Sequence, residues 1–151
     1  MQRLTHGTWV VVADGEKALF MENEGDGQYP VLRVRRLETH ENPPDRDQGT
    51  DKGGQIGNGR GGTGSAMDQT DFHQLEKDRF AHDLAQTLYK LAHAGRFDRL
   101  ILVAAPQTLG AIRPELHKEV QDRIVGEIAK SLTSMPIDKI EKAITDELAA
   151  A

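Results

Sequence analysis

The sequence predicts an α/β domain built on a mixed five-stranded sheet. Two short runs, 8–13 and 100–105, are almost continuously apolar, which is typical of central strands buried on both faces. A long helical pattern separates them, so they fit parallel strands joined by a crossover. The 151 residues suit one domain with a sizeable core. We therefore expect a single domain over residues 1–151.

Three antiparallel strands are expected to form a meander in the first part of the chain. The run 8–13 ends at Asp14-Gly15, a favoured tight-turn pair. A second strand is expected over 17–22 and a third over 29–37, with a glycine-containing turn over 24–27 between them.

A long amphipathic helix is expected between the two apolar runs. Asp71 with Gln74 three residues later forms a variant of the capping box and predicts the start of the helix. The helix should run to about His93, and Gly95 should end it in a left-handed conformation. Its apolar stripe is Leu75, Phe80, Leu84, Leu88 and Leu91.

The C-terminal third adds a short helical region, a strand and a last helix. Helical turns are expected from Thr108 to about Val120, with the stripe Leu109, Ile112, Leu116 and Val120. A fifth strand is expected over 123–131 with Ile124 and Ile128 inward; a continued helix is the alternative, which Gly126 disfavours. The last helix opens at Pro136 and carries Ile137, Ile140, Ile144 and Leu148. The predicted order is βββ-loop-αβαβα, with helices flanking the sheet.

A glycine-rich stretch separates the third strand from the long helix. Half of the residues from 49 to 64 are glycine, and Ile56 is the one apolar side chain there. Long loops of this kind are usually functional or disordered. We expect a mobile loop over 38–70 whose exposed contact region spans 42–67.

Composition excludes several classes of protein. The net charge of −5 argues against binding nucleic acid over the whole surface, although it allows a local basic patch. Without cysteine the chain has no disulfide framework and no thiol chemistry. The first residues lack the apolar core of a signal peptide, and no apolar run is long enough to cross a bilayer. We expect a cytoplasmic protein without a membrane partner.

Several segments, in a fixed order, carry a resemblance to a known family. They are 9–15, 45–47, 76–81 and 95–106, which read WVVVADG, DRD, EKDRFA and GRFDRLILVAAP, with Leu109-Gly110 behind them. Nearly the whole chain resembles the bacterial host-attachment protein family, short stand-alone relatives of the middle domain of archaeal and eukaryotic class-1 peptide release factors and Pelota. The resemblance implies an RNase H-like fold and a role in attachment to plant host cells. Because no export signal is seen, we expect any such role to be indirect.

Gly53-Gly54-Gln55 matches the tripeptide that release factors carry at the tip of a loop in the same topological place. The resemblance implies a catalytic role, in which two glycines allow close approach to ribosomal RNA. The backbone N–H of Gln55 would then stabilise the oxyanion as water attacks the peptidyl-tRNA ester. The alternative is a chance tripeptide in a glycine-rich loop, on a chain without codon-reading domains. We expect a non-catalytic binding module for a ribosome, RNA or protein partner, with a stand-alone peptidyl-tRNA ester hydrolase as the alternative.

A local basic surface is the second candidate site. Its residues are Arg33, Arg35, Arg36, Lys52 and Arg60, which would touch RNA phosphates. The alternative is an ordinary solvated strand face beside the acidic residues Asp45, Asp47 and Asp51.

No metal site and no cofactor are expected. Asp14 ends a central strand, where RNase H-like nucleases place a metal-binding carboxylate, but an Asp-Gly turn explains it and no later strand offers an inward carboxylate. Glu127 is expected to face solvent, and the six histidines lack ligand spacing. There is no Walker-type loop and no Gly-x-Ser-x-Gly elbow. The oligomeric state stays open, with edge-strand pairing as one possibility.

Overall fold

The computed structural model describes residues 4–39 and 66–150, with side chains of the long helix described from residue 75 onward. The elements are β1 (Trp9–Ala13), β2 (Lys17–Asn23), β3 (Leu32–Thr39), α2 (Ala66–His93), β5 (Leu100–Ala104), α3 (Pro106–Ile112), the 3₁₀ turn η1 (Arg113–Glu115), α4 (Lys118–Gln121), β6 (Ile124–Ile128) and α5 (Ile137–Ala150). The predicted α/β class and element order are confirmed. Because β3 ends at Thr39 and α2 begins at Ala66, both elements reach into the range 38–70 that was expected as loop.

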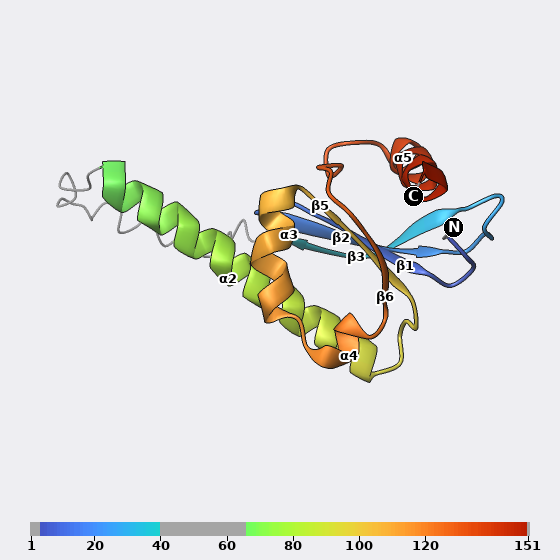
Figure 1. Cartoon of the computed structure of the whole chain (residues 1–151), viewed down its shortest axis with the longest axis horizontal. Helices are drawn as coiled ribbons and strands as arrows, with labels where there is room; N and C mark the ends of the chain where they lie inside the picture. Colours follow the sequence, from blue (N-terminus) through green and yellow to red (C-terminus); the bar gives the residue numbers. More distant parts are fainter. Residues whose placement is uncertain (1–3, 40–65, 151) are drawn as a thin grey trace.

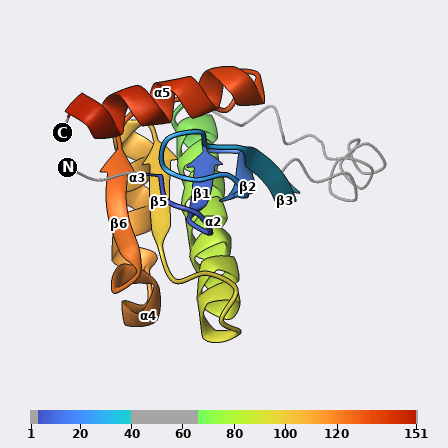
Figure 2. The ribbon, with the colours of Figure 1, turned by 90° about the vertical axis from the view of Figure 1, so that its right-hand side faces the viewer.

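The sheet has five strands in the order β3-β2-β1-β5-β6. β1 pairs antiparallel with β2 and parallel with β5, and β5 pairs parallel with β6. The predicted meander and the predicted parallel central pair are therefore both confirmed. Figure 2 shows β3 and β6 at opposite edges of the sheet, with β1 in the middle.

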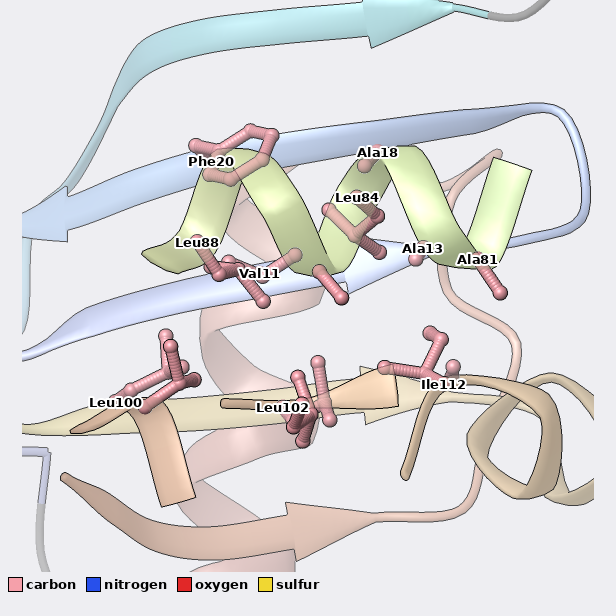
Figure 3. Close-up of a cluster of buried hydrophobic side chains, with 14 of the residues drawn as sticks. Val11, Ala13, Ala18, Phe20, Ala81, Leu84, Leu88, Leu100, Leu102 and Ile112 are labelled. Atoms are coloured by element: carbon pink, nitrogen blue, oxygen red, sulfur yellow. The ribbon is translucent and has the colours of Figure 1, made fainter. Parts of the chain in front are cut away.

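Two apolar layers cover the two faces of the sheet. On one face, alternate residues of β1 and β5 pack with β2 against α2, α3 and α4, and Figure 3 shows Leu84 and Leu88 of α2 among them. On the other face, the intervening residues of the same strands pack against α5. Figure 1 shows α5 on the opposite side of the sheet from α2, α3 and α4. Every residue of β1 and β5 is buried, as the continuous apolar runs predicted.

The predicted start of the long helix is wrong, while its end is confirmed. α2 begins at Ala66, five residues before Asp71, so Asp71 does not cap it. Leu75 was assigned to the buried stripe, yet it is 60% exposed, because the sheet meets α2 only from about Phe80 onward. Figure 1 shows the N-terminal part of α2 projecting past the sheet.

Gly95 ends α2 in the expected left-handed conformation, with φ of 75°. The N–H of Gly95 donates to the Ala92 carbonyl and the N–H of Arg96 to the Leu91 carbonyl, at 3.0 and 2.9 Å. These are the two bonds of a Schellman motif.

The third strand begins at Leu32, three residues later than predicted, because Asn23 holds the chain in a turn. The buried Asn23 accepts hydrogen bonds from the N–H groups of Gly25 and Val31 at 2.9 and 2.8 Å. Its amide donates to the carbonyl of Leu4 at 2.7 Å. A Cβ at Gly25 would lie 2.1 Å from the Tyr29 carbonyl oxygen, so this tight turn requires glycine.

The C-terminal elements follow the prediction with local differences. α3 begins at Pro106 rather than Thr108, since proline is well suited to the first position of a helix. β6 is confirmed, but a bulge beside Leu100 places Ile124 and Ile128 on opposite faces of the sheet. In α5, Ile140, Ile144 and Leu148 are buried as predicted.

Ile137 shares the predicted apolar spacing of α5, yet it is 37% exposed. It is the first residue of α5, and the buried stripe begins one turn later. Among the described helices, none combines the length and the apolar character that a membrane crossing requires.

Two glycine substitutions should change stability in opposite directions. Gly95→Ala should lower the free energy of unfolding by about 1 kcal/mol, because an L-residue is strained at positive φ. Gly110→Ala, inside α3 with open space around the added Cβ, should raise it by about 0.5 kcal/mol. Urea denaturation of both variants measures the difference, and equal effects would contradict the assigned cap.

Candidate functional site

A cleft lies at the carboxyl ends of the parallel strands β1 and β5, and it has a volume of about 370 Å³. Open α/β sheets bind ligands outside the carboxyl ends of their strands, so this cleft has the position of a ligand site. Its walls come from the turn after β1, from α2 and from α3. The lining residues are Gly15, Lys77, Phe80, Ala81, Gln107, Thr108 and Ala111.

Lys77 forms the border between this cleft and an acidic neighbour. A second hollow of about 390 Å³ shares Gly15 and Lys77 and adds Asp14, Glu16 and Glu76. A Cβ at Gly15 would lie 3.5 Å from Cγ of Lys77, so the lysine stem passes directly over the turn. The cleft offers an ammonium, an amide and a hydroxyl above an apolar floor. That set suits binding of a small polar group, and no histidine among the lining residues pairs with Thr108 as a base.

The cleft residues Lys77, Gln107 and Thr108 were not predicted from the sequence. Their position in the sequence could have indicated Gln107 and Thr108, because polar residues that directly follow buried parallel strands lie at the same edge of the sheet. Gln107 and Thr108 follow β5 in this way. Lys77 lies on a helix that projects past the sheet, and no local pattern distinguishes it from other exposed lysines.

Asp14 is engaged as a turn residue, as the Asp-Gly pair predicted. One carboxylate oxygen accepts from the N–H groups of Glu16 and Lys17 at 2.7 and 2.8 Å. The other oxygen accepts from the hydroxyl of Thr133 at 2.7 Å. Among the side chains that the structure describes, residues 4–39 and 75–150, no three His, Asp or Glu side chains converge as a metal site would require. Glu127 is the exposed residue of the edge strand β6, and it pairs with Arg113 at 2.6 Å.

The three arginines of the predicted basic surface lie together on β3, each paired with glutamate. Arg33 pairs with Glu24 at 3.2 Å, and Arg36 pairs with Glu38 at 2.8 Å. Arg35 binds Glu22 at 2.9 Å and also binds Glu24. The described part of the basic surface is thus a band of alternating charge rather than a bare cationic patch. Lys52 and Arg60 lie outside the described residues.

The hydrogen bond from Arg35 lowers the pKa of Glu24 below its usual value, and the positive charges of Arg35 and Arg33 add to this effect. The carboxylate form is favoured because it accepts the charged donor. Glu24 therefore stays ionised to lower pH than a free glutamate.

Gly53, Gly54 and Gln55 also lie outside the described residues, as does the expected contact region 42–67 up to residue 65. The structure fixes what stands on either side of them. β3 leads into this segment at the edge of the sheet, and α2 leads out of it towards the core.

Histidines connect α2 to the segment after α3, a feature that the sequence did not reveal. His82 and Glu115 lie 2.9 Å apart, and His93 and Glu119 lie 3.1 Å apart. His117 accepts from the N–H of Glu119 as the N-cap of α4, and its ring lies 4.2 Å from that of Tyr89. His82 and His93 lie on the exposed face of α2, and these contacts account for them structurally.

Residues 7–144 match the family described as bacterial archaeo-eukaryotic release factor family 12. The chain belongs to this family, which confirms the expected relationship to release factors.

An uncharacterized protein of Rickettsia prowazekii (strain Madrid E) is similar in sequence. It is 30% identical over 77 residues, and the alignment covers 50% of this chain and 51% of that protein. The similarity thus spans about half the length of this curated relative.

The ion-pair band can be tested by titration. Arg35→Ala should raise the pKa of Glu24 towards its usual value, because the variant removes the hydrogen bond that lowers it. In the wild type the folded pKa lies below the unfolded one. The stabilising contribution is therefore present above the unfolded pKa and is lost as pH falls through the folded pKa. NMR titration of the Glu24 carboxyl measures this. Arg113→Ala, whose partner is Glu127, should leave the Glu24 titration unchanged.

Proposed function

We propose that this chain is a non-catalytic, release-factor-like binding module that contacts the ribosome through the segment 42–67. The observation that carries the proposal is membership in a release-factor family over residues 7–144. A location in the cytoplasm, where ribosomes are found, belongs to the same proposal.

The strand order supports an RNase H-like fold, which we infer from the topology. Three antiparallel strands are followed by two that run parallel to the first, in the order β3-β2-β1-β5-β6. In this arrangement the segment between β3 and α2 takes the place at which release factors hold their Gly-Gly-Gln loop. A fold that anchors both ends of a segment on rigid elements is suited to presenting it to a partner.

The ion pairs on β3 make its arginines weaker candidates for contact with RNA. Arg33, Arg35 and Arg36 are already paired with glutamates, so contact with phosphates would require partner exchange at each arginine. Lys52 and Arg60, within the segment itself, are the cations we assign to the ribosomal contact. A protein partner at the same segment and an indirect role in host-cell attachment are consistent with this arrangement.

The second candidate function is peptidyl-tRNA ester hydrolysis, favoured by Gly53-Gly54-Gln55. In that mechanism water attacks the ester carbonyl and the Gln55 N–H stabilises the resulting oxyanion. The tRNA 3′ hydroxyl then leaves with a proton.

Ribosome co-sedimentation tests the binding module. The wild type should sediment with ribosomes at low salt, and the bound fraction should fall steeply as salt rises, because phosphate contacts release counterions. Lys52→Ala/Arg60→Ala should reduce the bound fraction several-fold, whereas the control Lys118→Ala/Lys142→Ala removes two exposed lysines elsewhere and should not. A wild type that stays in the supernatant at low salt would exclude ribosome binding.

A peptidyl-tRNA release assay separates the two candidates. A non-catalytic module should release no peptide above the uncatalysed rate, and Gly53→Ala and Gln55→Ala should match the wild type. Release that falls at least 10-fold in Gly53→Ala, with co-sedimentation retained, would instead establish the hydrolase.

A further inference from the structure

β3 is an edge strand, and no described strand pairs with its outer side. The backbone hydrogen bonds between β1 and β2 show which residues of β3 direct their N–H and C=O groups towards β2 and which direct them outward. The N–H of Asn23 donates to the carbonyl of Thr8 beside β1, so the backbone groups of Asn23 and of every second residue of β2 point towards β1. The backbone groups of the intervening residues Glu22, Phe20 and Ala18 therefore point towards β3. Their partners on β3 are Arg33, Arg36 and Glu38.

The remaining residues of β3 direct their backbone groups outward. The N–H of Leu32 confirms this, because it donates to the carboxylate of Glu141 on α5 at 2.7 Å instead of to β2. A bulge beside Phe20 and Met21 inserts Arg35 into the strand. The outward set is therefore Leu32, Val34, Leu37 and Thr39.

The two faces of this edge differ in chemistry. Val34 and Leu37 stand opposite Met21 and Leu19, which belong to the face of the sheet that α5 covers. α5 does not cover the edge, so Val34 and Leu37 are 43% and 57% exposed. The arginines and Glu38 occupy the other face, where Glu38 accepts a hydrogen bond from Thr87 of α2 at 2.7 Å. The edge is apolar on one face and charged on the other.

We propose that β3 pairs antiparallel with β3 of a second copy of this chain, about a two-fold axis between Arg35 and Arg36. In this register Val34 stands opposite Leu37 of the second copy, and Leu32 stands opposite Thr39. All four positions belong to the outward set, so each outward residue meets another outward residue. A shift of the register by one or two residues in either direction places outward residues opposite inward ones, because the bulge makes the set symmetric only about this axis.

The side chains are complementary in the same register. Val34 and Leu37 form an apolar cross-strand pair on the face of α5, and symmetry repeats it. On the charged face Arg33 stands opposite Glu38 of the second copy. The central pair of Arg35 and Arg36 has like charge, but glutamates already bind both side chains within each copy. Charged residues and a bulge limit edge pairing in general, and here they restrict it to one register. The contact is small, so the dimer should be transient and concentration-dependent.

Cysteine cross-linking tests the register directly, because the chain contains no cysteine. Val34→Cys/Leu37→Cys brings pairs of Cα atoms to about 5.5 Å across the two-fold axis, within the span of a disulfide. In either single variant the equivalent cysteines of the two copies lie roughly 10 Å apart along the strands, which is too far. Mild oxidation should give a covalent dimer of the double variant at least 10-fold more efficiently than of either single variant. Equal yields from single and double variants would overturn the register.

Sedimentation velocity over a concentration series tests the association without modification. The wild type should shift reversibly from monomer to dimer. Leu37→Pro should stay monomeric, since it removes an outward N–H and leaves the bonds between β2 and β3 in place. Circular dichroism confirms that this variant is folded, and Ile137→Ser, which removes another exposed apolar side chain, should dimerise like the wild type. A wild type that remains monomeric throughout, with no cross-linking of the double cysteine variant, would overturn the proposal.

Discussion

The rest of the structure depends on the burial of β1 and β5 on both of their faces. Their ten residues are all buried, and each strand supplies side chains to two separate apolar layers. Full burial of a Val, Leu or Ile side chain contributes about 1.5–3 kcal/mol, more than any exposed ion pair in the molecule can supply. A helix on only one face would leave the alternate residues in water. Both α2 and α5 are therefore required, and the parallel pairing of β1 with β5 requires the long connection that carries the glycine-rich segment.

Strong local patterns allowed much of this fold to be predicted from the sequence. Buried strands appear as continuous apolar runs, and Gly95 ends α2 because only glycine adopts its conformation without strain. The predictions that were wrong concern features that depend on how the elements pack together. Leu75 has the spacing of the apolar stripe but lies beyond the sheet. Asp71 is a residue type that favours an N-cap, but α2 begins five residues before it. The bulge in β6 that separates Ile124 from Ile128 has no sequence pattern of its own.

The candidate sites were less predictable, for the same reason. The arginines of β3 were predicted to form a basic surface, yet their partners Glu22 and Glu24 come from the neighbouring strand and turn, and only the register brings them together. Asp14 was correctly attributed to a turn, while its bond to Thr133 joins residues 119 positions apart. The cleft residues Lys77 and Thr108 meet only because α2 and α3 pack at the same end of β1 and β5.

β3 combines the features on which both proposals depend. It is the one element that borders the glycine-rich segment, carries the arginines and stands at the edge of the sheet. Its glutamate partners keep the arginines engaged on the face of α2, so attraction for RNA phosphates is weakened there. Its apolar side chains lie on the other face, and its outward backbone groups lie along the edge. Nucleic-acid contact would use the charged face of the strand, whereas strand pairing would use its outer edge. Under the proposed function, a second copy at the edge would bring two segments 42–67 to one assembly, which would raise avidity for the ribosome without any new contact.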